Sequence, residues 1–165
     1  YKPVDIGRVF AAIDTLAPAR QSPARRAWRD AELSRWAKVR GLPISVAPKF
    51  WPVPVGFASR AVIAVQDMGR DPGALSSRFL RAVWHDDLDI SDTETVKRLV
   101  TQCEPDAAVR ILEAASGERT AVIFKANTAE AIEKGVIGSP TFIVDDEMLF
   151  GQDRLNFLAA KFGLA

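Results

Sequence analysis

The residues best suited to chemistry lie in two short segments near the C-terminus. Ser139 and Pro140 come directly before the apolar run 141–144, and the tetrapeptide Gly-Gln-Asp-Arg occupies positions 151–154. A cis proline at this place would turn the backbone N–H and C=O of Ser139 outward, where they could pair with an extended peptide-like ligand. Backbone N–H groups at the start of a last helix would suit a carboxylate, and Asp153 beside them would suit an ammonium group. Together the two segments predict a site for the α-amino acid end of a ligand.

Each of these residues also has a purely structural interpretation. Ser139–Pro140 would then be an ordinary trans start to a strand. Asp153 would cap the last helix, and Arg154 would form an ion pair within the protein. The residues alone leave both interpretations open.

A β-hairpin must position the two segments. The runs 141–144 and 147–150 flank an Asp-Asp pair, which is typical of a tight turn between antiparallel strands. Helical spacing of the apolar residues from Leu155 to Phe162 predicts a final helix packed on this hairpin. A hairpin followed by a helix is half of a thioredoxin-like fold, so the sequence predicts an α/β protein.

Most of the remaining chain is predicted to be helical. Ser22 followed by Pro23 is typical of a helix start, and Gly41 ends that helix. Ser91 and Glu94 have the spacing of a capping box, in which Ser91 would be the N-cap. The other predicted elements are a strand at 1–6, a short turn or helix at 7–13, a proline-rich loop at 42–55, and helices at 56–68, 71–84, 92–103, 105–116 and 119–134.

Composition excludes several classes of function. The net charge is +1, so bulk charge favours neither nucleic acid nor an acidic membrane as a partner. One cysteine, Cys103, and one histidine, His85, cannot build a zinc cluster or a Cys-x-x-Cys pair within these residues. No apolar run approaches the roughly 18 residues of a transmembrane helix. We expect a cytoplasmic protein that acts on a small molecule, with a structural Cys103 and a surface or helix-terminal His85.

Aromatic and basic side chains supply further candidates. Phe50 and Trp51 in the proline-rich loop are candidates for a substrate pocket, and Arg25, Arg26 and Arg29 make a basic start to a helix. We expect Arg26 and Arg29 on a solvated helix face. The other three tryptophans are expected in the core: Trp28, Trp36 and Trp84.

The segment GVIGSPTFIVDDEMLFGQDRLNFL closely resembles the C-terminal end of 2-hydroxychromene-2-carboxylate isomerases, which belong with kappa-class glutathione transferases and DsbA-like proteins. YKPVDIGRVF, SPARRAWRDAELSRWAKVRGLP and FWPVPVGFASRAV resemble earlier parts of the same family. The resemblance implies a thioredoxin-like domain at 1–20 and 135–165 with a large all-helical insertion at 21–134. It also implies glutathione as cofactor, cis–trans isomerisation of an aromatic pyruvate-type substrate, and a possible homodimer.

By this resemblance Ser139 and Pro140 would hold the cysteinyl backbone of glutathione, and Gln152, Asp153 and Arg154 would meet its γ-glutamyl end. Arg25 stands where the family usually has a lysine that reaches ligand carboxylates, and Phe50 and Trp51 face the site. The serine that activates the glutathione sulfur belongs to a strand–helix unit expected upstream of Tyr1.

Two departures from the family pattern suggest an altered ligand. Pro54 replaces a common asparagine, and arginine replaces lysine at position 25. Two other functions therefore stay open. One is a DsbA-like thiol–disulfide oxidoreductase, and the other is a non-catalytic thioredoxin-fold binding protein.

Overall fold

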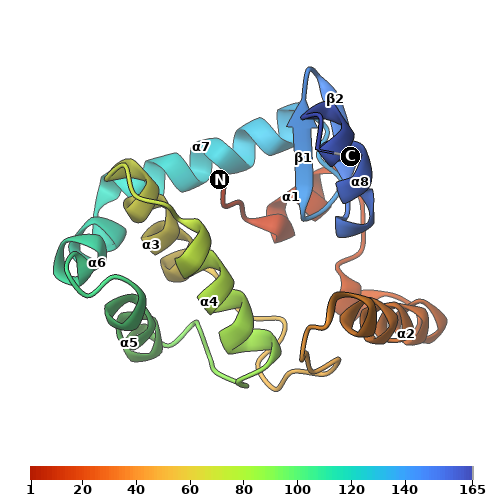
Figure 1. Cartoon of the computed structure of the whole chain (residues 1–165), viewed down its shortest axis with the longest axis horizontal. Coiled ribbons are helices and arrows are strands. Elements are labelled where there is room, and N and C mark those ends of the chain that lie inside the picture. Colours follow the sequence, from red (N-terminus) through yellow and green to blue (C-terminus); the bar gives the residue numbers. More distant parts are fainter. Residues whose placement is uncertain (165) are drawn as a thin grey trace.

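The computed structural model describes residues 1–164 and consists mainly of helices, with a two-stranded sheet near the C-terminus (Figure 1). No helix in this part of the chain is long and apolar enough to cross a bilayer. The elements are α1 (Ile6–Ala12), a 3₁₀ turn (Pro18–Arg20), α2 (Pro23–Arg40), α3 (Gly56–Asp67), α4 (Gly73–Trp84), α5 (Thr93–Cys103), α6 (Ala108–Ser116), α7 (Glu118–Glu133), β1 (Thr141–Val144), β2 (Glu147–Phe150), a second 3₁₀ turn (Gln152–Arg154) and α8 (Leu155–Lys161).

The larger of two separate hydrophobic cores lies among α3, α4, α5 and α6. Each helix buries one apolar face there, and the fully buried side chains include Val65, Leu75, Leu99 and Ile111. Burying a side chain of this size contributes about 1.5–3 kcal/mol. The bundle therefore has its own hydrophobic core, and it holds the loops at its ends.

The smaller core joins α1, α7 and the hairpin. Val9, Ala131 and Val136 are buried in it, and Ile143 and Met148 of the hairpin pack against them. Helix α7 also packs against α3 and α6, so this one helix contacts both the bundle and the smaller core. The predicted boundary between the helical insertion (21–134) and the thioredoxin-like segment (135–165) remains a prediction. Helix α7 ends just before that boundary and contacts elements on both sides of it.

The hairpin matches the sequence prediction closely. Its strands span 141–144 and 147–150, with Thr141 opposite Phe150 and Val144 opposite Glu147. Asp145 and Asp146 both have positive φ angles, of 50° and 61°, which aspartate tolerates better than most residues. The register places residues 138–140 and 151–154 together at the open end of the hairpin.

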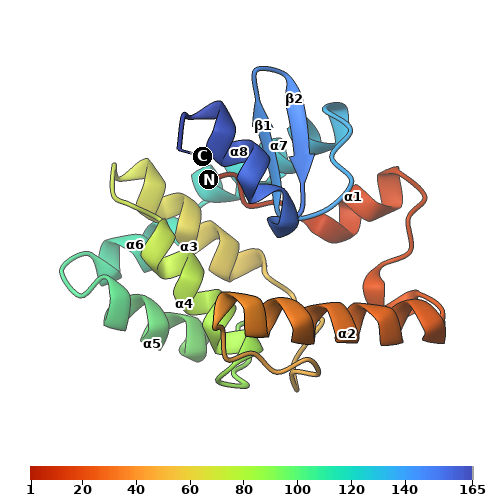
Figure 2. The same ribbon diagram turned by 45° about the vertical axis from the view of Figure 1, so that its right-hand side comes forward.

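Helix α2 lies apart from both cores. Ser22 accepts a hydrogen bond from the N–H of Arg25, and Gly41 ends the helix with φ of 63°, as predicted. No residue of α2 is buried, and Trp28 is 59% exposed, so the prediction that Trp28 and Trp36 lie in the core is wrong. Trp84 is partly buried and packs against the core of the bundle. The helix passes below the hairpin and α8 in both ribbon views (Figure 2).

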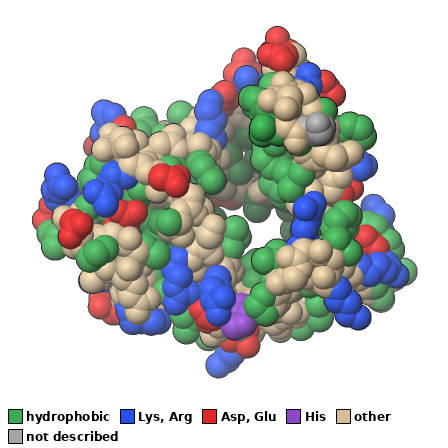
Figure 3. Space-filling model, viewed as in Figure 1, with side chains coloured by type: hydrophobic (Ala, Val, Ile, Leu, Met, Phe, Trp, Pro, Cys, Tyr) green, Lys and Arg blue, Asp and Glu red, His purple; other side chains and the backbone are tan. Residues whose placement is uncertain are grey.

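The molecule has an opening between the helical bundle and the side formed by the hairpin and α2 (Figure 3). Hydrophobic side chains border it on both sides. The two cores have no buried residue in common. The bundle and the hairpin are thus connected around the rim, through α7 and α2.

Two local predictions are wrong. Residues 1–5 form no strand, because the N–H of Asp5 donates to Thr128 Oγ1 and the C=O of Pro3 accepts from Asn127, so this segment runs along α7. The N-cap of α5 is Asp92, not Ser91. The Asp92 carboxylate accepts from the N–H groups at 94 and 95, and the Ser91 hydroxyl donates to Asp89 instead.

Candidate functional site

A backbone hydrogen bond holds the two predicted segments side by side. The N–H of Gly151 donates to the C=O of Pro140 at 2.9 Å. The Thr141 hydroxyl donates to the C=O of Gly138 at 2.7 Å, which fixes the other end of the proline loop. The peptide bond between Ser139 and Pro140 is cis. The structure thus brings Ser139, Pro140 and residues 151–154 to one edge of the molecule.

The backbone of Ser139 is available for a ligand. The residue is exposed, and its N–H and C=O form no hydrogen bond with any other residue of the described chain. An unpaired extended backbone next to a strand is what an added peptide strand requires.

Residues 151–154, called the acidic-basic turn below, form a 3₁₀ turn and not the first turn of an α-helix. Asp153 caps neither this turn nor α8, so its capping interpretation is not realised. Its carboxylate lies 3.1 Å from the Arg154 guanidinium, and both side chains are about half exposed. An exposed pair of this kind contributes at most about 1 kcal/mol, so a ligand could replace it. The carboxylate remains accessible to an ammonium group.

The helix after the turn is short. α8 has seven residues, and none of them is buried. Its dipole is accordingly a weaker source of positive charge for a carboxylate than the sequence suggests. Full positive charge near the turn therefore comes from side chains and not from the helix dipole.

Arg40, at the end of α2, reaches this turn and was not among the predicted site residues. Its Nε lies 3.4 Å from Gln152 Oε1, and its Nη2 lies 3.4 Å from the Gln152 carbonyl oxygen. The sequence gives no sign of this contact, because Arg40 looks like an ordinary cation in the last turn of a helix.

Arg25 lies at the other end of α2. It is fifteen residues from Arg40, which is about 22 Å along a helix. Arg25 is exposed, and its guanidinium lies 6.0 Å from the ring of Trp28. The structure therefore does not bring Arg25 to the acidic-basic turn.

The ring of Trp51 packs against other side chains of the protein. The guanidinium of Arg29 lies 4.2 Å from the centre of the Trp51 ring and 5.6 Å from that of Trp84, and the two rings are 5.7 Å apart. The Arg29 side chain is only 22% exposed, so its predicted place on a solvated face is wrong. The reason is a cation–π contact between α2 and the bundle. Phe50, next in the loop, is half-buried and lies 5.0 Å from Lys49 Nζ.

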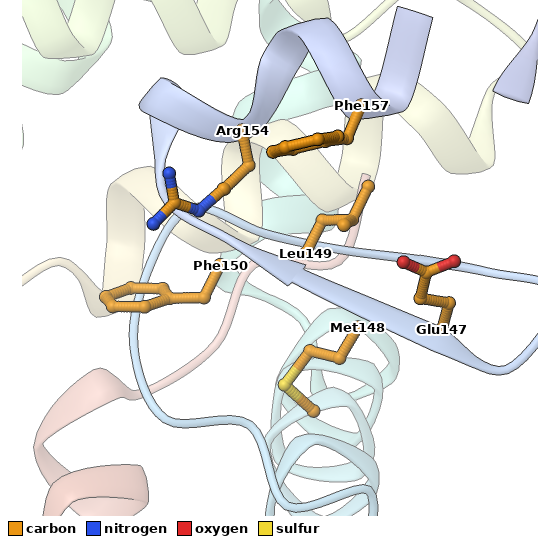
Figure 4. Close-up of a pocket in the computed structure, with 6 residues that line it drawn as sticks. All are labelled: Glu147, Met148, Leu149, Phe150, Arg154 and Phe157. Carbon is orange, nitrogen blue, oxygen red and sulfur yellow. The ribbon is translucent and has the colours of Figure 1, made fainter. Parts of the chain in front are cut away.

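A shallow pocket of about 260 Å³ lies beside the turn, between β2 and α8 (Figure 4). Arg154 extends over β2, Phe157 lies above Leu149, and Phe150 lies next to the guanidinium. Phe150 also covers Gly138, where an added Cβ would overlap its ring. The pocket shares Arg154 with the acidic-basic turn.

The position of α8 is fixed partly by charge. Lys161 Nζ lies 2.8 Å from Glu147 Oε2 on β2. The hydrogen bond with Glu147 raises the pKa of Lys161 above its usual range. This pair connects the far end of α8 to the strand and so helps to hold the turn in place.

Comparison with known proteins gives consistent matches across the chain. A family model of the DSBA-like thioredoxin domain matches residues 1–163. The 2-hydroxychromene-2-carboxylate isomerase of Pseudomonas putida is 29% identical over 171 residues, covering 99% of this chain and 78% of that protein. The protein of the same name from Sphingobium xenophagum is 24% identical, covering 96% of this chain and 79% of that protein.

Two solved structures have the same fold. A 2-hydroxychromene-2-carboxylate isomerase superposes with a TM-score of 0.76 at 25% identity, covering 99% of this chain and 78% of that one. The cytosolic disulfide reductase DsbM of Pseudomonas aeruginosa superposes with a TM-score of 0.62 at 18% identity, covering 88% of this chain and 80% of that one, which bears on the fold alone. The predicted thioredoxin-like fold and the resemblance to 2-hydroxychromene-2-carboxylate isomerases are both confirmed. The chain belongs to the DsbA-like thioredoxin family.

Proposed function

We propose that this protein is a glutathione-dependent isomerase of an aromatic or conjugated pyruvate-type small molecule. The observation that carries the proposal is the hydrogen bond from the Gly151 N–H to the Pro140 carbonyl, which joins the segment of Ser139 to the segment of Asp153. The names of the relatives support the isomerase class.

The groups at this edge fit glutathione by their chemistry. The free N–H and C=O of Ser139 match the backbone of its cysteinyl residue, as in strand addition. The exposed carboxylate of Asp153 matches the ammonium of its γ-glutamyl end. Pro140 accepts the hydrogen bond that joins the two segments, and Gln152 and Arg154 offer further polar groups. These residues would hold glutathione along the edge of the hairpin.

When bound, glutathione supplies a thiol that adds reversibly to a conjugated double bond, so that the bond can rotate before elimination. The residues of this chain would orient the tripeptide and hold its charged end. The hydroxyl that activates the sulfur is proposed to come from a segment upstream of Tyr1. Phe50, half-buried in the proline-rich loop, stays a candidate for contact with the substrate. Trp51, which packs against Arg29, and Arg25, which lies at the other end of α2 from the turn, also stay candidates for contact with the substrate.

Thiol–disulfide exchange would need a second thiol. Cys103 is the one cysteine of this sequence, and it lies at the end of α5 in the bundle. Burial raises the pKa of its thiol, which lowers the thiolate fraction at neutral pH. Cys103 therefore does not supply the chemistry of an oxidoreductase.

The test is a titration of the intact protein with glutathione. Asp153→Asn removes one charge at nearly constant shape and should weaken binding about tenfold or more, because a charge-assisted hydrogen bond is lost. Asp145→Asn removes the same charge at the other end of the hairpin and should leave binding unchanged. Turnover of a panel of conjugated aromatic pyruvates then tests the reaction.

The proposal fails if the intact wild-type protein does not bind glutathione at millimolar concentration. Binding without turnover of any conjugated acid would instead favour a non-catalytic binding protein. Intact mass and N-terminal sequencing of the natural protein would show whether a serine motif, or a Cys-x-x-Cys, precedes Tyr1.

A further inference from the structure

Arg40 is held beside the acidic-basic turn from two sides. On one side it contacts the amide oxygen and the carbonyl oxygen of Gln152, both at 3.4 Å. On the other side the ring of Trp36 has its centre 5.5 Å from the guanidinium carbon. The side chain therefore has a defined place although it is exposed.

The charges near the turn are not balanced. Arg154 is paired with Asp153, whereas Arg40 forms no ion pair with any residue of the described chain. The turn and Arg40 together hold two guanidinium groups and one carboxylate. Glutathione at neutral pH carries two carboxylates and one ammonium, so its net charge is opposite to that of this group of residues.

A guanidinium has five N–H donors in a planar fork, and Gln152 uses two of those of Arg40. The remaining donors suit a carboxylate, and the residue that Arg40 contacts, Gln152, directly precedes Asp153 in the chain. An α-amino acid end needs both partners at once, one for its ammonium and one for its carboxylate. Arg154 is less suited to this second role, because it already pairs with Asp153 at 3.1 Å.

We propose that Arg40 binds the α-carboxylate of the γ-glutamyl end of glutathione while Asp153 binds the neighbouring ammonium. This inference rests on the proposed function and adds a specificity-determining residue to it. Arg40 then connects α2 to the ligand, so the helix contributes directly to selection of a γ-glutamyl thiol over shorter thiols.

The test compares two ligands and four variants of the intact protein. Glutathione and cysteinylglycine, which lacks the γ-glutamyl group, are titrated by NMR, a method that follows millimolar affinities. Arg40→Ala should weaken glutathione binding about tenfold and change cysteinylglycine binding less than twofold. Arg40→Gln, which keeps most of the stem, should behave in the same way if the alanine variant folds poorly. Arg40→Lys should recover part of the affinity, because it keeps the charge without the fork. Lys38→Ala removes a charge from the same helical turn and should leave both affinities unchanged.

Two outcomes overturn the inference while the proposed function survives. In one, wild-type protein binds glutathione and Arg40→Ala binds it equally well. In the other, Arg40→Ala weakens both ligands by the same factor, which would mean that Arg40 only supports the turn. If the wild-type protein does not bind glutathione at all, the proposed function fails and this inference fails with it.

Discussion

Gly151 is the residue on which the geometry of the site depends most directly. Its backbone has φ of 101° and ψ of 152°, a region that is essentially restricted to glycine. A Cβ at this position would overlap Asp153 Oδ1, and its N–H makes the hydrogen bond to Pro140. Gly151→Ala therefore acts on the backbone, on Asp153 and on the proline loop at once.

The expected cost can be worked out from these contacts. A non-glycine residue in this region costs about 1–3 kcal/mol, and loss of the hydrogen bond to Pro140 adds about 0.5–1.5 kcal/mol. A total of about 1.5–4.5 kcal/mol should destabilise the turn. Because α8 buries no residue, much of this cost should appear as local opening of the turn and α8 rather than as global unfolding.

Hydrogen exchange of the residue-151 amide measures this local opening. After correction for intrinsic rates, Gly151→Ala should exchange at least about 13-fold faster than wild type, which corresponds to about 1.5 kcal/mol. Asp153→Ala combined with Gly151→Ala removes the overlap and should recover part of the protection. Gly69→Ala is the matched control, since Gly69 also has positive φ, 72°, but open space around it. The reasoning is refuted if protection at residue 151 survives the substitution, or if Gly69→Ala lowers it equally.

Two further predictions concern the contacts that hold α2 and α8. Arg29→Ala should lower the free energy of unfolding of the protein by about 1 kcal/mol. The reason is that it removes a partly desolvated cation–π contact between α2 and the bundle. Urea titration followed by tryptophan fluorescence checks this, and an equal effect of Arg26→Ala would contradict it. The raised pKa of Lys161 means that its pairing with Glu147 stabilises α8 below the ordinary lysine value of about 10.5 and is lost as pH rises through the higher folded value. Amide exchange in α8 across this pH range should show the loss in wild type and not in Glu147→Gln.

The hairpin could be predicted from sequence because its signals are local. Two short apolar runs set the strands at 141–144 and 147–150, and two aspartates that tolerate positive φ set the turn. The register then places Ser139 beside the acidic-basic turn without further information. The fold class and this half of the site follow from a stretch of about twenty residues.

Other predictions depended on tertiary contacts that no local pattern contains. Residues 1–5 look extended, but Thr128 and Asn127 of α7 take up their backbone groups. Trp28 looks like a core residue in the helical pattern of α2, yet α2 has no core to face. In the α5 cap, Ser91 and Asp92 compete for the same role, and the aspartate accepts two N–H groups at once. Sequence spacing alone does not decide which of two adjacent residues caps a helix.

Two arginines of α2, Arg29 and Arg40, make contacts that sequence analysis missed. Because α2 buries no side chain, hydrophobic contact alone does not fix its position. Arg29 fixes one point of it against Trp51 and Trp84, and Arg40 fixes another against Gln152. Arg29 is eleven residues before Arg40, or about 16 Å along the helix. Through these two contacts α2 connects Trp51 and Trp84 with the acidic-basic turn, although the two hydrophobic cores share no buried residue.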